Sequence, residues 1–245
     1  MKSSTSYGKL SCLFYDTMKT FAPQREVDFF ASFIEQNPGR VLEAMCGSGR
    51  LLIPLMQRGY TIDGVDNSTI MLERCMQRAE KSNIVPELYN QSLEDLKLPQ
   101  RYSVVTIAVG SFQLITEYQS AVTSLKNLHK HMDKNGSLLI DIFIPDYTGD
   151  VRNIRVASIN NNESIRLTTR YVFYPEEQRA DAFSLYELII NGQVQEQEDE
   201  MLQIVWRTDD QWISLLSEAG FEVIKFYDEV FRASGPSRII HARAL

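Results

Sequence analysis

Residues 41–50 read VLEAMCGSGR, a short apolar run that leads into two glycines one residue apart. An apolar run, a Gly-x-Gly pair and then the amphipathic stretch 49–59 predict a buried strand, a tight turn and a helix. Glycines at positions 47 and 49 let the backbone turn sharply and approach a ligand where a Cβ atom would intrude. Taken alone, this segment is also compatible with an ordinary strand-to-helix turn, so its meaning depends on the rest of the chain.

Short apolar runs alternate with amphipathic stretches on both sides of this turn. We predict strands at 40–44, 61–65, 85–90, 103–109 and 136–144, and helices at 49–59, 68–81 and 118–132. The segment before Val41 predicts one or two further helices, one of them over 28–36. Such alternation is typical of an α/β domain whose strands form a parallel sheet.

The pattern changes after Pro145, which ends the fifth predicted strand. Residues 164–174, 180–190 and 193–205 alternate without intervening helices, so we predict an antiparallel meander of at least three strands. A helix over 208–220 and two strands at 221–229 and 237–244 complete the prediction. The order is therefore five βα units, an inserted antiparallel sheet, one helix and a terminal strand pair.

Composition narrows the classes of function. The 245-residue chain has a net charge of −7 and no dense Lys/Arg cluster, so we expect no nucleic-acid partner. It has neither a signal peptide nor an apolar run long enough for a membrane span, so we expect a cytoplasmic protein with no membrane contact. The three cysteines predict reduced thiols, and His129 and His131 face different sides of a helix, so we expect no metal site.

Two acidic residues define the kind of ligand. Asp66 follows Gly49 by 17 residues and ends the second predicted strand, where a carboxylate can accept the hydroxyls of an adenosine ribose. An NAD-binding turn would have a third glycine, but Leu52 stands there, and Glu43 would repel a pyrophosphate. A nucleoside that carries an ammonium and a sulfonium group would instead be attracted to Glu43.

The E-x-x-x-G-x-G pattern followed by Asp66 resembles the first motifs of class I S-adenosylmethionine-dependent methyltransferases. Within that family, the chain is similar to small-molecule enzymes with a β-rich insertion after the fifth strand. The resemblance implies a Rossmann-like, seven-stranded α/β sheet with a terminal antiparallel strand pair. It implies a cofactor domain at 1–146 and 207–245, in which 1–39 form a helical cap, and an inserted β lid or dimerisation subdomain at 147–206.

The same resemblance assigns roles to individual residues. Glu43 would hold the methionine end of the cofactor, Asp66 its ribose, and Asn67 and Met71 would flank the adenine. The family usually has an Asp-Met pair at the adenine edge, where this chain has Ser92 and Leu93, with Glu94 as an alternative acceptor. The full set of expected cofactor-binding residues is Tyr15, Glu43, Ala44, Cys46, Gly47, Ser48, Gly49, Arg50, Asp66, Asn67, Met71, Ser92, Leu93 and Gly110.

The resemblance also locates the reaction site. Gly110, Ser111, Phe112 and Gln113 follow the fourth strand and would border the transferred methyl group. The Asn/Asp-Pro-Pro-Tyr/Phe sequence expected of adenine and glutamine N-methyltransferases is absent here, which argues against those substrates. Tyr15 would close over the cofactor, although it also fits a helix-packing aromatic residue, and Tyr15 and Gln113 are the catalytic candidates.

We therefore expect transfer of a methyl group from S-adenosylmethionine to a nitrogen or oxygen atom of a small-molecule acceptor, by in-line displacement, with S-adenosylhomocysteine as product. Two alternatives stay open: an NAD-dependent oxidoreductase and a non-catalytic S-adenosylmethionine-binding protein. The meander would select the substrate, form a homodimer interface, or do both. Its acidic run 195–200 is interpreted as a solvated strand face, and its aromatic residues as core or pocket wall: Tyr171, Phe173, Phe183 and Tyr186.

Overall fold

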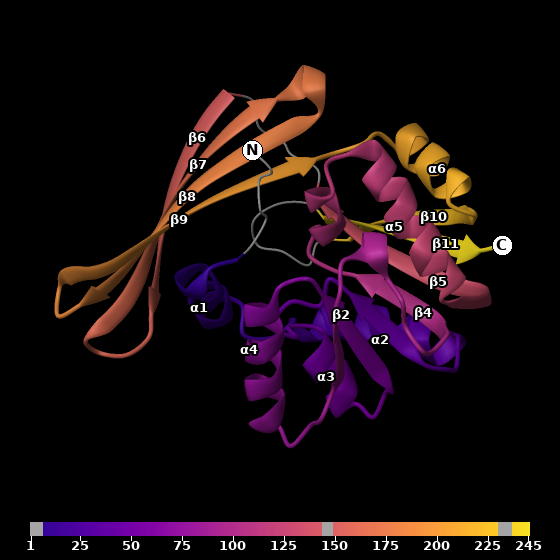
Figure 1. Ribbon diagram of the computed structural model, residues 1–245, viewed down its shortest axis with the longest axis horizontal. Coiled ribbons are helices and arrows are strands. Elements are labelled where there is room, and N and C mark those ends of the chain that lie inside the picture. The colour runs from indigo at the N-terminus through magenta and orange to yellow at the C-terminus, as the bar shows by residue number, and fades with distance from the viewer. Residues whose placement is uncertain (1–6, 144–148, 230–236) are drawn as a thin grey trace. The chain divides into compact units, whose positions relative to one another are not determined.

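The computed structural model describes residues 7–143, 149–229 and 237–245, which form two units (Figure 1). Of these residues, one unit contains 21–143, 206–229 and 237–245, and the other contains 7–20 and 149–205. The predicted end of the fifth strand at Pro145 and the predicted start of the insertion at residue 147 lie outside the described residues.

The larger unit is built on a seven-stranded sheet with the order β10-β11-β5-β4-β1-β2-β3. Strands β5, β4, β1, β2 and β3 are parallel to one another, and β11 pairs antiparallel with both β5 and β10. The predicted α/β fold with a terminal antiparallel strand pair is therefore confirmed. The strands are β1 (Val41–Ala44), β2 (Ile62–Asp66), β3 (Glu87–Asn90), β4 (Tyr102–Ile107), β5 (Met132–Phe143), β10 (Phe221–Glu229) and β11 (Ser237–Ala244).

Helices cover both faces of this sheet because the strands are apolar on both sides. On one face, α2 (Gln24–Gln36), α3 (Leu52–Gln57) and α4 (Thr69–Glu80) contribute to a buried apolar cluster. On the other, α5 (Tyr118–Lys130) and α6 (Asp209–Glu218) contribute to a second cluster. The N-terminus of α6 carries a capping box in which Thr208 and Gln211 satisfy each other's backbone N–H groups.

The smaller unit is a four-stranded antiparallel sheet in the order β6-β7-β8-β9. Its strands are β6 (Gly149–Ser158), β7 (Glu163–Tyr174), β8 (Arg179–Ile190) and β9 (Gln193–Val205). The three predicted strands are present. The fourth, β6, is an addition whose alternation in 151–158 the sequence analysis leaves unassigned.

Helix α1 (Lys9–Met18) belongs to this smaller unit. Leu10 and Phe14 pack against Ile165, Leu167 and Tyr186 on one face of the sheet. The predicted cap over 1–39 is thus divided among the described residues: α1 groups with the meander, whereas α2 packs on the seven-stranded sheet.

The acidic run of β9 is only partly exposed to solvent, so its predicted role as a solvated strand face is wrong for Glu198 and Glu200. The carboxylate of Glu198 accepts hydrogen bonds from the backbone N–H groups of Leu10 at 2.8 Å and Ser11 at 2.9 Å. Glu200 is half-buried and accepts a hydrogen bond from the hydroxyl of Tyr186 at 3.1 Å. The first amides of a helix have no partner within the helix, so an acidic residue is stabilising there. Glu198 therefore fastens α1 to the sheet.

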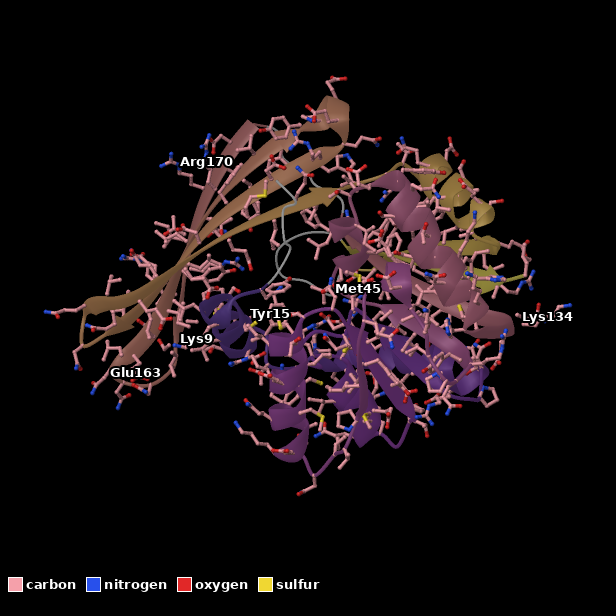
Figure 2. The ribbon with its side chains drawn as sticks, viewed as in Figure 1. Lys9, Tyr15, Met45, Lys134, Glu163 and Arg170 are labelled. Carbon is pink, nitrogen blue, oxygen red and sulfur yellow. The ribbon has the colours of Figure 1, made fainter. Side chains whose placement is uncertain are left out.

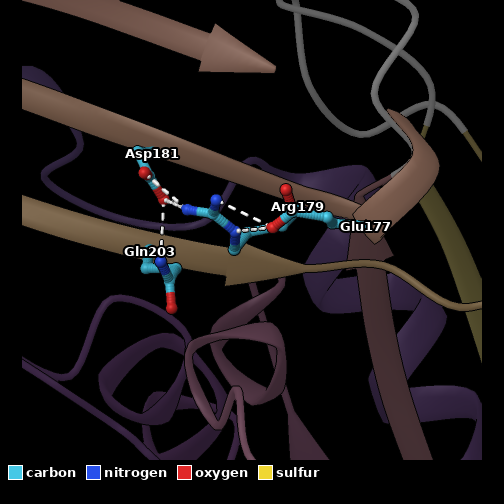
Figure 3. A network of polar contacts seen from close by, with 4 residues as sticks. All are labelled: Glu177, Arg179, Asp181 and Gln203. Carbon is cyan, nitrogen blue, oxygen red and sulfur yellow. Dashed lines mark hydrogen bonds and ion pairs between the residues drawn. The ribbon is translucent and has the colours of Figure 1, made fainter. Parts of the chain in front are cut away.

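Polar side chains on the opposite face of the sheet are also paired (Figure 3). Arg179 donates to both oxygens of Asp181 at 2.7 and 2.6 Å and to Glu177 at 2.9 Å. Gln203 on β9 donates to Asp181 at 2.8 Å. Asp181 is buried, and this network satisfies its charge while linking β8 to β9.

Candidate functional site

The turn after β1 contains Gly47 and Gly49. Both have left-handed backbone angles, with φ +54° at Gly47 and +77° at Gly49. A Cβ atom at Gly47 would meet no atom of the described residues within 4 Å apart from its chain neighbours, whereas one at Gly49 would lie 2.6 Å from the Sγ atom of Cys75 on α4. Gly47 thus leaves its backbone open to a ligand, and Gly49 is required for the close packing of α4.

Asp66 joins this turn to the end of β2. Its Oδ2 atom accepts a hydrogen bond from the N–H of Gly47 at 2.8 Å, and its Oδ1 atom accepts one from the N–H of Ser68 at 2.9 Å. Burial raises the pKa of Asp66, and these backbone donors oppose the rise. Each carboxylate oxygen has more than one lone pair, so Asp66 can still accept the two hydroxyls of a ribose.

Glu43 is a buried carboxylate near the carboxyl end of β1. Its side chain is 3% exposed, and its Oε2 atom has no hydrogen-bond partner among the described residues. Burial raises the pKa of Glu43 to about 8; Arg50 opposes this rise, and Glu26 and Asp66 reinforce it. A buried acceptor without a partner costs free energy, so its presence points to a ligand that supplies the missing donor.

Arg50 does not remove this deficit because its guanidinium is bound to Glu26 on α2. Arg50 Nη1 donates to Glu26 Oε2 at 2.9 Å, and Nη2 contacts the other carboxylate oxygen. Both side chains are buried. The pair joins the turn to α2, so the structure gives the predicted cofactor residue Arg50 an internal partner.

The other predicted residues of the turn are also engaged within the protein. The hydroxyl of Ser48 accepts a hydrogen bond from Arg78 at 2.7 Å. Ala44 and Cys46 are buried in the two apolar clusters, and the N–H of Cys46 donates to the carbonyl of Val65. Any contact of these residues with a cofactor would therefore come from the backbone, and it remains a prediction.

The residues predicted to surround the adenine follow β2 and β3. Asn67 is exposed, whereas Met71 is buried in the first turn of α4, where its N–H donates to the hydroxyl of Ser68. Ser92 caps the 3₁₀ turn Leu93–Asp95, since its hydroxyl accepts from the N–H of Asp95 at 3.2 Å. Leu93 is buried. The hydroxyl of Ser92 thus has an internal partner, and its predicted contact with adenine is untested.

At the end of β4, Gln113 lies on the 3₁₀ turn Ser111–Leu114. Its side chain is 1% exposed, and both ends of its amide bind the backbone of Phe143. Nε2 donates to the carbonyl at 2.9 Å, and Oε1 accepts from the N–H at 2.6 Å. Gln113 therefore fixes this turn against the end of β5, and its predicted catalytic role stays a prediction.

Asp141, which was not predicted as a functional residue, supports the same region. Its Oδ2 atom accepts a hydrogen bond from the N–H of Val109 at 2.7 Å, and its side chain is 2% exposed. Val109 has φ +61°, an unusual angle for a β-branched residue. An acidic residue inside the apolar run GSLLIDIFI was the available signal, because a buried carboxylate in a strand needs a nearby donor.

Tyr15 lies on α1 (Figure 2), in the smaller unit, whereas Glu43 and Asp66 lie in the larger one. Its ring makes an edge contact with Tyr7, with ring centroids 6.5 Å apart, and Lys19 Nζ lies 5.1 Å from its centroid. These contacts are local to the smaller unit, and closure of Tyr15 over a cofactor remains a prediction.

Within 7–143, 149–229 and 237–245, no group of three His, Cys, Asp or Glu side chains could bind a metal ion. No helix in the same ranges has the length and apolar character needed to span a bilayer.

Comparison with known proteins identifies relatives of this site. Residues 41–136 match a family described as "Methyltransferase domain". A putative methyltransferase of Geobacillus sp. (strain WCH70) is 23% identical over 219 residues, which cover 86% of this chain and 87% of the relative. The matched family region contains the β1 turn, Glu43, Asp66 and the end of β4.

Two solved structures share the fold over nearly the whole chain. CalS10 of Micromonospora echinaspora, an amino pentose methyltransferase solved with S-adenosylmethionine, has a TM-score of 0.75 at 12% identity, with 98% of each chain covered. The sugar N-methyltransferase KedS8 of Streptoalloteichus sp. has a TM-score of 0.75 at 15% identity, covering 98% of this chain and 97% of the other.

Proposed function

We propose that this chain, which is a class I S-adenosylmethionine-dependent methyltransferase, transfers its methyl group to a nitrogen or oxygen atom of a small molecule, with an amine as the preferred acceptor. S-adenosylmethionine is the cofactor, and S-adenosylhomocysteine is the product it leaves. The observation that carries the proposal is the pair of carboxylates at the β1 and β2 ends, because one of them, Glu43, keeps an oxygen that has no hydrogen-bond partner in the part of the chain that the structure describes.

The two carboxylates fit the two polar ends of this cofactor. Glu43 offers a buried acceptor to the ammonium of the methionine part, and Asp66 offers two oxygens to the ribose hydroxyls. Gly47 lies between them in the chain, and its open backbone leaves room for the linking atoms. Binding of the cationic ligand would favour loss of the Glu43 proton, and the resulting buried negative charge attracts a cation more strongly than it would in water.

The bound sulfonium supplies an electrophilic methyl group, so the protein has to align the acceptor lone pair and exclude water. The turn 110–113 follows β4 on the same edge of the sheet as the β1 turn, because parallel strands have their carboxyl ends together. Gln113 and Asp141 fix that turn through Phe143 and Val109. They would thereby hold the floor against which an acceptor is aligned.

The structural neighbours support an amine over a hydroxyl as the acceptor, because CalS10 is an amino pentose methyltransferase and KedS8 is a sugar N-methyltransferase. A neutral amine also has a nucleophilic lone pair without prior loss of a proton, so the site needs no strong base. Tyr15, Asp16 or a residue of the meander is our candidate to accept the proton released after transfer.

Two measurements test this function. Thermal unfolding should shift upward with S-adenosylhomocysteine and not with NADH, because only the former supplies a cation to Glu43. Incubation with isotopically labelled S-adenosylmethionine and a panel of amino sugars, each paired with its hydroxyl analogue, should label amines preferentially. A larger shift with NADH would refute the cofactor assignment, and labelling of hydroxyl analogues alone would refute the amine preference.

A further inference from the structure

We propose that Arg207 is an anion-binding residue beside the reaction site, where it holds a carboxylate or phosphate group of the methyl acceptor. This inference rests on the proposed function, because it concerns the acceptor of that reaction. Arg207 lies between β9 and the N-terminus of α6, in the larger unit. Its side chain is half-buried, and its Nη1 atom is shielded from solvent without a hydrogen-bond partner among the described residues.

The missing counterion sets Arg207 apart from comparable arginines. Three other half-buried arginines form ion pairs at 2.6 Å: Arg40 with Asp63, Arg179 with Asp181 and Arg238 with Asp209. The described part of the chain gives Arg207 no such carboxylate. A guanidinium stays charged in proteins, so its burial without a counterion costs free energy. Its presence therefore points to an anionic ligand that supplies the missing charge.

The groups that contact Arg207 are aromatic. Its Cζ atom lies 5.3 Å from the centre of the Trp212 ring, which is close enough for a cation–π contact. Burial lowers the pKa of Arg207, and Tyr118 at the start of α5 opposes this. The hydroxyl of Tyr118 donates to Glu218 at 2.8 Å, so this acidic residue already has a partner. An aromatic ring can orient a guanidinium but cannot neutralise it, so the charge stays available to an anion.

The topology places Arg207 at the edge of the sheet where the reaction site is predicted. Strand β10 is parallel to β5, because both are antiparallel to β11. Helix α6 packs on β10 and leads into its amino end, so α6 begins at the carboxyl edge of the sheet, directly after Arg207. Helix α5, which lies beside α6, follows β4 and begins at the same edge (Figure 1).

Aromatic packing connects Arg207 to the turn 110–113. The ring of Phe112, which belongs to that turn, lies 5.9 Å from the ring of Trp212. Both aromatic side chains are buried. Arg207 and the turn thus contact the same indole ring. An acceptor aligned at the turn would place its anionic group at Arg207 while its amine faces the methyl donor.

The chemistry of the guanidinium defines the anion. Its N–H donors form a planar fork that fits two oxygens of a carboxylate or a phosphate. Because Arg207 is only half-buried, the outer part of this fork is reachable from solvent. The net charge of −7 disfavours a polyanion such as nucleic acid, so the anionic group belongs to a small molecule.

Tryptophan fluorescence tests this site without any cofactor. The chain has two tryptophans, so Trp206→Phe leaves Trp212, which contacts Arg207, as the reporter. In this background and at constant ionic strength, inorganic pyrophosphate or malonate should change the fluorescence saturably. The anion that binds more tightly identifies the preferred group as phosphate or carboxylate.

Variants of Arg207 assign the binding to this side chain. Arg207→Gln should weaken anion binding by about tenfold or more, because the charge is lost. Arg207→Lys should weaken it less, because an ammonium keeps the charge without the planar fork. Arg101→Gln is the matched control and should bind as the parent does, since Arg101 is 61% exposed and paired with Asp133. Far-ultraviolet circular dichroism establishes that each variant is folded.

Amino sugars connect the anion site to the acceptor. Glucosamine 6-phosphate and muramic acid carry the same amine as glucosamine, with a phosphate and a carboxylate added. At least one of them should bind about tenfold more tightly than glucosamine, and Arg207→Gln should abolish the difference.

The outcomes separate the anion site from the proposed function. A fluorescence that does not respond to either anion, or an equal affinity in folded Arg207→Gln, would overturn the anion site. Anions that bind at Arg207 without any gain for the two anionic amino sugars would overturn its role in acceptor recognition. Failure of the proposed function would instead be seen as the lack of a thermal shift with S-adenosylhomocysteine, a measurement that contains no acceptor.

Discussion

Buried carboxylates at the two ends of the parallel sheet differ in their hydrogen-bond partners. At the amino end, Asp63 is fully buried and accepts hydrogen bonds from Arg40 at 2.7 and 2.6 Å and from the hydroxyl of Tyr102 at 2.8 Å. At the carboxyl end, Glu43 is almost as buried, yet one of its oxygens has no partner among the described residues. The same sheet therefore holds one carboxylate with all its partners in place and one that lacks them.

This difference distinguishes a carboxylate that stabilises the fold from one that is available to bind a ligand. A carboxylate with complete partners favours the folded state, whereas an incomplete one reduces stability until a ligand completes it. Functional sites commonly contain a buried polar group without a partner, whereas buried polar groups elsewhere in the same protein are paired. The experiments below alter one end of the sheet at a time.

The largest expected effect is a pH dependence at the carboxyl end. Glu43 keeps its proton up to a pKa of about 8 in the folded chain but loses it near its ordinary value of 4.5 when unfolded. Between these pH values the folded state binds more protons, so its stability falls as the pH rises, by on the order of 4 kcal/mol in total. Denaturant titration of the cofactor-free chain at pH 5 and pH 8 measures this. Glu43→Gln should abolish the loss of stability between pH 5 and pH 8. An equal loss of stability in that variant would mean that other titrating groups cause it.

At the amino end, Asp63→Asn should lower the free energy of unfolding by about 3 kcal/mol, because the amide removes the negative charge that pairs with Arg40 and replaces one of the two acceptor oxygens with a donor. Cofactor affinity of the folded fraction should not change. Asp133→Asn, whose carboxylate is 51% exposed in its pair with Arg101, should change stability by less than about 0.5 kcal/mol. If Asp63→Asn lowered the free energy of unfolding no more than Asp133→Asn does, the hydrogen bonds of Asp63 would contribute little to stability.

Glu43→Gln should weaken the binding of S-adenosylhomocysteine by about 10- to 100-fold, or about 1.4–2.7 kcal/mol, because an amide cannot neutralise the ammonium. Isothermal titration calorimetry at pH 8 measures the affinity. Glu73→Gln on the exposed side of α4 is the control and should bind as the wild type does. Unchanged affinity in Glu43→Gln would remove Glu43 from the cofactor site.

The smallest expected effect concerns Met45, which follows β1 with φ +58° (Figure 2). A left-handed angle costs a residue with a Cβ about 1–2 kcal/mol, and the entropy of glycine in the unfolded chain offsets part of that. Met45→Gly should therefore stabilise the chain by at most about 1 kcal/mol in thermal or chemical unfolding. A destabilised variant would show that the Met45 side chain, half-buried against the core, outweighs the strain.

The sequence was sufficient to predict the order of strands and helices in the larger unit and three strands of the meander, because apolar periodicity and the Gly47 turn are local signals, but it did not predict β6. It also predicted Glu43 and Asp66 as ligand-binding carboxylates, because the first precedes the Gly-x-Gly turn and the second ends the next strand; their contacts with the cofactor stay a prediction. It could not predict the partners of Arg50 and Gln113, which come from Glu26 and Phe143, because only the folded chain brings those residues together. For the same reason, the contact of Glu198 with α1 could not be predicted from the acidic run alone.

The attachment of α1 to β9 has a consequence for the order of synthesis. The ribosome releases α1 before any strand of the meander, and all of β1 to β5 emerges between the two. A helix of 10 residues is marginal in water by itself, so α1 should remain unstructured on the nascent chain until Glu198 is translated. Protection of the Leu10 and Ser11 amides from hydrogen exchange would therefore report when the meander has formed.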